Sequence, residues 1–246
     1  MPLPLLAALM VWSGWQSAQL AHPFSGDARI QVSVTAHMWW WEVRYRDTRS
    51  GREAVLANEL RLPVGERVYL ALTTPDVLHA FWVPALAGKV DMVPGRVHGL
   101  TLRAGAPGRY RGQCAEYCGT QHASMALNVI AQPAAGFDDW LAGQARPAPP
   151  PQVAGGMARG PAIFLAARCN ACHTVRGIAE GGRSGPDLTH LASRSHIAAG
   201  ALPFSRAALL GWIANPQSAK PGARMPPSSL APEDLQTLAA WLETLE

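Results

Sequence analysis

The chain has 246 residues, with 21 basic and 17 acidic side chains and a net charge of +4. This length predicts two ordinary domains, each large enough to bury its own core. Basic and acidic residues are interspersed without a long basic run, which argues against nucleic-acid binding and predicts no nucleic-acid partner.

Residues 1–21 form an apolar segment, because the first 26 residues contain no Asp, Glu, Lys or Arg. A membrane-spanning helix needs about 20 mostly apolar residues, and residues 2–20 barely meet that length. Trp12 and Trp15 suit a membrane interface. We therefore expect a truncated membrane helix, with a signal remnant as the main alternative and a core segment as the third. A signal peptide would carry a positive region that is missing here.

Residues 22–145 show the pattern of a β domain. Apolar side chains alternate with polar ones from Ile30 to Val34 and from Val68 to Leu72, and Gly, Pro and Asp clusters separate these runs. Further strands are expected over 97–102, 109–113 and 125–130, with a short helix over 134–142. Short strands at this spacing predict a β-sandwich or a small barrel.

Residues 146–156 read as a linker, because prolines stiffen them and glycines loosen their end. From residue 157 to 246 the apolar spacing becomes helical. Ser205 is placed to cap one helix, and Pro232 suits the first turn of the last one. This half is expected to be a small all-α domain.

Soft metal ligands lie close together in the β domain. Two thiols, two imidazoles, a thioether and a backbone carbonyl select copper over hard cations; they belong to His79, Cys114, Glu116, Cys118, His122 and Met125. Two cysteines four residues apart can bridge two metals. A zinc site or a Cys114–Cys118 disulfide are the alternatives, but zinc prefers closed four-ligand sites with other spacings.

The helical half carries a haem c attachment motif, Cys169-Asn-Ala-Cys172-His173. The two thiols can bind the haem vinyl groups, and His173 can supply an axial nitrogen. Met225, in a proline-rich loop, is the candidate second axial ligand, which would raise the reduction potential; a core methionine is the alternative. The Pro186 carbonyl is a candidate partner for the free ring nitrogen of His173.

These motifs resemble subunit II of cytochrome c oxidase, with its copper A site, fused to a class I cytochrome c as in oxidases of the caa type. The resemblance implies a cupredoxin-like Greek-key sandwich followed by an all-α cytochrome c domain. It also implies a dinuclear copper centre bridged by Cys114 and Cys118, with one histidine on each copper. Met125 and the Glu116 carbonyl are then the weak ligands.

Two further roles follow from the same resemblance. Trp39, in the Trp39-Trp40-Trp41 run, would carry electrons at the docking surface near copper. Strand alternation alone favours Trp40 as the exposed residue, since Trp39 and Trp41 would face the core. The Glu116 carboxylate would bind a magnesium or manganese ion at the boundary with subunit I.

The implied function is electron transfer in a redox-driven, proton-translocating oxidase. Electrons would pass from a cytochrome c or another reduced donor through haem c and copper A to haem a of subunit I, where oxygen is reduced to water. The expected partners are subunits I and III in a bacterial inner membrane, with both redox domains on the outer face. A nitric oxide reductase subunit and a free-standing exported carrier are the alternatives.

Overall fold

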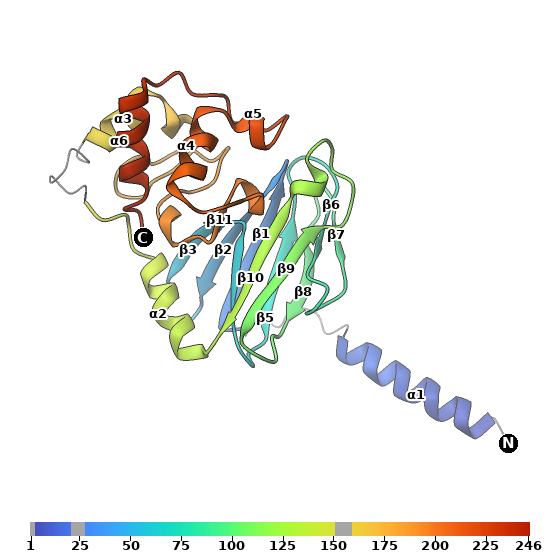
Figure 1. The fold of residues 1–246 in the computed structure, drawn as a ribbon. Coiled ribbons are helices and arrows are strands. Elements are labelled where there is room, and N and C mark those ends of the chain that lie inside the picture. Colours follow the sequence, from blue (N-terminus) through green and yellow to red (C-terminus); the bar gives the residue numbers. More distant parts are fainter. Residues whose placement is uncertain (1–2, 21–27, 151–158) are drawn as a thin grey trace.

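The computed structural model describes residues 3–20, 28–150 and 159–246. Figure 1 shows a β-sandwich with a smaller helical unit against one end of it. The sandwich strands are β1 (Ile30–His37), β2 (Trp40–Asp47), β3 (Glu53–Ala57), β4 (Glu59–Pro63), β5 (Val68–Thr73), β6 (His79–Trp82), β7 (Val90–Met92), β8 (His98–Leu102), β9 (Gly108–Cys114) and β10 (Ala126–Gln132).

The strands form two five-stranded sheets, with the orders β3-β2-β1-β5-β8 and β4-β10-β9-β6-β7. In β1, Ile30, Val32 and Val34 are buried while the residues between them are partly exposed. This alternation arises because successive strand side chains point to opposite faces. The predicted β-sandwich is confirmed.

Helix α2 (Ala134–Gln144) closes the sandwich, close to the predicted range of 134–142. It buries Phe137 and Leu141 in the sandwich core. Trp140 packs edge-on against Tyr45 of β2, with ring centroids 5.3 Å apart. The helix therefore closes the sandwich beside β3 and β4.

The helical unit contains α3 (Gly160–Ala166), α4 (Arg206–Ala214), α5 (Pro216–Ala219) and α6 (Pro232–Leu242). Helices α3 and α6 approach each other closely at Gly160, where an added Cβ would lie only 2.2 Å from Trp241 Cβ. The Ser205 hydroxyl accepts a hydrogen bond from Ala208 N at 3.2 Å, and Pro232 begins α6, both as predicted.

One part of the second domain differs from the all-α expectation. A two-stranded ribbon, β11 (His196–Ile197) paired with β12 (Leu202–Pro203), interrupts the helices. Ala198, Ala199 and Gly200 between the strands all have positive φ. This left-handed backbone reverses the chain tightly, which neither alanine signals in the sequence.

Helix α1 (Leu3–Leu20) covers most of the predicted segment 1–21, and its described side chains are exposed. Among the described residues, no helix combines the length and apolarity needed to cross a membrane. Residues 151–156 of the predicted linker lie outside the described residues. Its first part packs on the helical unit, where Ala148 is buried and its N–H donates to Arg176 O at 3.0 Å.

Candidate copper and haem sites

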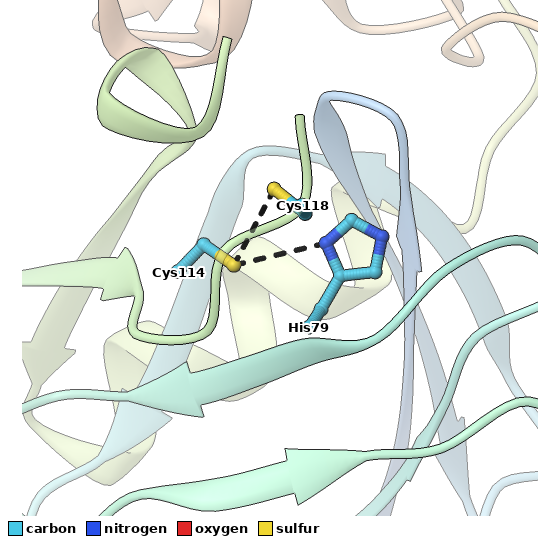
Figure 2. A group of neighbouring side chains, drawn as sticks. All are labelled: His79, Cys114 and Cys118. Atoms are coloured by element: carbon cyan, nitrogen blue, oxygen red, sulfur yellow. Dashed lines mark hydrogen bonds between the residues drawn. The ribbon is translucent and has the colours of Figure 1, made fainter. Parts of the chain in front are cut away.

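The two cysteines of the β domain face each other at one end of the sandwich (Figure 2). Cys114 ends β9, and Cys118 follows in the next loop. Both are buried, and their Sγ atoms lie 3.8 Å apart. A disulfide requires about 2.05 Å, so both thiols are free to bind metal.

Cys114 has two further donor atoms beside it. His79, the first residue of β6, places its Nδ1 3.7 Å from Cys114 Sγ. The Glu116 carbonyl oxygen lies 3.2 Å from the same sulfur. One sulfur is thus flanked by an imidazole and a carbonyl.

Cys118 has a matching pair of neighbours. His122 Nδ1 lies 3.6 Å from Cys118 Sγ, and Met125 Sδ lies 3.9 Å from it. His122 is only partly buried, whereas Met125 is fully buried. All six predicted donors therefore converge, and their soft sulfur and imidazole atoms fit copper.

Asp76 orients His79 and was not anticipated from the sequence. Its carboxylate bonds His79 Nε2 at 2.9 Å, which leaves Nδ1 directed at the sulfurs. It also accepts hydrogen bonds from the backbone N–H groups of Met38 and Val77. Such a carboxylate fixes the tautomer and direction of a ligand histidine. The Asp-x-x-His spacing was the available signal.

The two thiols titrate as a pair. Their shared hydrogen bond is the main cause that lowers the pKa of Cys114 and raises the pKa of Cys118. Burial raises both pKa values and is outweighed only at Cys114. The first proton therefore leaves easily, while loss of the second requires a bound cation that stabilises the second thiolate.

Trp39 lies beside this loop. Its indole Nε1 donates to the Cys118 carbonyl at 2.8 Å. The ring packs on Gly119, where an added Cβ would lie 3.1 Å from Trp39 Cζ2. Trp39 belongs to the turn before β2 and not to the strand, so strand alternation does not apply to it. Trp40 does face away from the sandwich core, but it is buried against Ala57 and Ala199, so the expectation that it is exposed is wrong.

The Glu116 side chain is partly exposed and pairs with a lysine. Its carboxylate lies 3.5 Å from Lys89 Nζ, and that amine also bonds Asp91 at 2.8 Å. The carboxylate and the carbonyl oxygen of Glu116 therefore have different neighbours. Only the carbonyl belongs to the sulfur cluster.

The haem motif forms a short turn in the helical unit. Cys169 is partly buried and Cys172 is exposed. His173 Nδ1 lies 2.8 Å from the Pro186 carbonyl, so this nitrogen donates and Nε2 remains free. Burial lowers the pKa of His173, which favours the neutral imidazole that binds iron.

The surroundings of His173 also suit a haem. A Cβ on Gly185 would lie 2.7 Å from His173 Cε1, so only glycine allows this close approach. Met225 packs on the helical core, and its carbonyl accepts a hydrogen bond from Gln217 Nε2 at 3.3 Å. An oriented imidazole, two unpaired thiols and a thioether fit covalently attached haem.

Each half of the chain matches a known protein family. Residues 30–132 match the family described as cytochrome c oxidase subunit II, periplasmic domain, and residues 157–246 match cytochrome c. The solved periplasmic domain of subunit II of cytochrome oxidase from Bradyrhizobium japonicum is 28% identical, with a TM-score of 0.44. That likeness covers 48% of this chain and 94% of the solved one.

Several curated relatives are named cytochrome c oxidase subunit 2, among them two that match most of the chain. That of Alkalihalophilus pseudofirmus is 38% identical over 91% of this chain and 64% of its own length. That of Bacillus sp. strain PS3 is 32% identical over 88% of this chain and 62% of its own length. The chain thus spans less than two thirds of each relative. Its residues 30–132 belong to the cytochrome c oxidase subunit II family, and residues 157–246 to the cytochrome c family.

Proposed function

We propose that the chain is the electron-transfer subunit of a haem-copper terminal oxidase. It would receive electrons from a cytochrome c or another reduced donor and pass them to subunit I, where oxygen is reduced to water. One observation carries this proposal. The loop before Met225 rests on the copper loop, with Gln121 Nε2 donating to the Pro221 carbonyl at 2.7 Å.

The copper centre would be dinuclear. Cys114 and Cys118 would bridge two coppers, with His79 and His122 as terminal ligands. Met125 and the Glu116 carbonyl would be the weak ligands, each beside a different sulfur. Such a centre supplies one-electron transfer shared over two metals. The rigid sheets that anchor both ends of the copper loop would keep the ligand positions similar in both redox states.

The haem would be covalently bound to Cys169 and Cys172. His173 would be one axial ligand, held by the Pro186 carbonyl, and Met225 the other. A thioether ligand raises the reduction potential, which suits a carrier that accepts electrons from outside and delivers them inward.

Trp39 would be the residue through which electrons approach copper, since its ring nitrogen bonds the carbonyl of the bridging Cys118. The Glu116 carboxylate would bind magnesium or manganese together with subunit I. Its partial exposure and its position beside the copper loop support this role.

The partners would be subunit I and subunit III in a bacterial inner membrane, with both redox domains on the periplasmic face. Residues 1–21 would then be a membrane segment. The names of the relatives favour an oxidase over a nitric oxide reductase subunit or a free-standing exported carrier.

Purification of the tagged chain from native membranes tests the proposal. We expect subunit I with haem a to co-purify, and two coppers and one haem c per chain by metal and pigment analysis. Recovery of the catalytic subunit of a nitric oxide reductase, or of the soluble chain alone, would contradict it. One tightly bound zinc in place of copper would contradict the site.

A further inference from the structure

The chain has two lysines, and they lie in opposite surroundings. Lys89 is 48% exposed on the side chain and pairs with Asp91 and Glu116. Lys220, in the cytochrome c domain, is only 3% exposed. Its Nζ donates to the carbonyl oxygens of Trp39 at 2.8 Å and Ser124 at 2.9 Å, both in the copper domain. The Ala198 carbonyl of its own domain lies at 3.4 Å.

Two contacts flank Lys220. On one side, Gln121 Nε2 donates to the Pro221 carbonyl at 2.7 Å. On the other, Ala199 of the β11–β12 turn is buried against Trp40 and Ala57. The apolar contact can hold the domains together, but it has few features that would select one orientation.

A buried ammonium group, in contrast, can select one orientation of the docked domain. Burial lowers the pKa of Lys220 to about 8, which still leaves the amine largely protonated at pH 7. A buried charge is costly unless hydrogen-bond acceptors surround it. Sliding or rotating the domain would leave this charge without the Trp39 and Ser124 carbonyls. Buried polar groups of this kind specify one arrangement more than they add stability.

We propose that Lys220 sets the register in which the cytochrome c domain docks on the copper-bearing end of the sandwich. The docked domain, and not a soluble cytochrome, then occupies the surface formed by Trp39, Trp40 and Gln121. Met225 lies five residues beyond Lys220, so this register also places its loop beside the copper loop. The path of the electrons in this inference rests on the proposed function, whereas the docking of the cytochrome c domain does not.

The transfer itself is a single electron from reduced haem c to oxidised copper, with no bond formed or broken. The external reduced donor restores that electron at the haem. Lys220 is a positioning residue in this step, because its amine contacts backbone carbonyls and neither redox centre.

Acylation of amines in the full chain tests the docking. With a water-soluble acetylating reagent and peptide mass analysis, Lys89 should react and Lys220 should be protected. Ala57→Glu, which places a carboxylate against Ala199, should raise Lys220 labelling roughly tenfold to a hundredfold and leave Lys89 unchanged. Gln121→Ala should raise it less and leaves the apolar contact intact. Equal labelling of both lysines in the unaltered chain would overturn the proposal.

Lys220→Met tests the register, with Lys89→Met as the matched control that removes the other lysine. In the loaded full chain, Lys220→Met should slow copper reduction by haem c while the external donor reduces haem c at its normal rate. It should also let a soluble cytochrome reduce copper directly. Protection of Lys220 together with unchanged transfer in Lys220→Met would overturn the positioning role. Labelling measures docking even in a chain that transfers no electrons, so its result tests the docking independently of the proposed function.

Discussion

The Asp76 carboxylate should determine how tightly His79 holds copper. Burial alone would raise the pKa of Asp76, but hydrogen bonds from His79, Val77 and Met38 outweigh it and hold that pKa below its usual range. The group is therefore ionised at neutral pH and fixes the imidazole. Removing such a partner costs about 10- to 100-fold in metal affinity, or about 1.4–2.7 kcal/mol. We expect this loss in Asp76→Ala, and a smaller one in Asp76→Asn, which keeps an acceptor oxygen.

Competition of the full chain with a copper chelator would measure this affinity. Asp76→Ala also leaves two backbone N–H groups without their acceptor, which costs about 1–3 kcal/mol of stability if they stay buried. Asp47→Ala is the matched control. Asp47 is buried at the opposite end of β2 and accepts hydrogen bonds from Ser50 and Arg49. The Asp47→Ala variant should be less stable than the unaltered chain but should keep its copper affinity. Equal copper affinity in the Asp76→Ala and Asp47→Ala variants would refute the reasoning.

Four other substitutions are expected to affect the copper centre, the haem centre or the transfer between them in distinguishable ways. Cys118→Ser should abolish the two-copper state, as counted by metal analysis, while haem content stays at one per chain. Met225→Ala should keep haem covalently attached and lower its midpoint potential in a redox titration, because the thioether that favours ferrous iron is lost. Gly185→Ala should displace the His173 ring, since its Cβ would lie 2.7 Å from Cε1, and this should alter the haem spectrum. Trp39→Phe removes the bond to the Cys118 carbonyl. It should slow haem-to-copper transfer in stopped flow without slowing haem reduction by the donor.

Local spacing explains why most of the two sites could be predicted. Five of the six copper-site residues lie within twelve consecutive positions, and the haem motif occupies five consecutive residues. In both cases the ligand geometry follows from a short stretch of backbone. The strands β3, β4, β6 and β7, each of five residues or fewer, were not anticipated.

Contacts between distant segments explain what the sequence did not reveal. Trp40 faces outward on β2, as alternation indicates, yet Ala199 of the other domain covers it. The burial of Lys220 likewise depends on carbonyl oxygens of Trp39 and Ser124, more than 90 positions away along the chain. Backbone carbonyls carry no side-chain signal, so no pattern in the sequence could indicate them as partners of a lysine.

Because a linker joins the two domains, a small contact is enough to keep them docked. A short linker gives the second domain an effective concentration in the millimolar range. Docking in about nine chains of ten then requires an intrinsic dissociation constant of only about 0.1 mM, or about 5.5 kcal/mol. One apolar cluster, the Gln121–Pro221 hydrogen bond and the Lys220 amine are of the right scale for this. Since affinity is supplied largely by the tether, the contact residues can be selected for register, which is the property that a buried lysine among carbonyls provides.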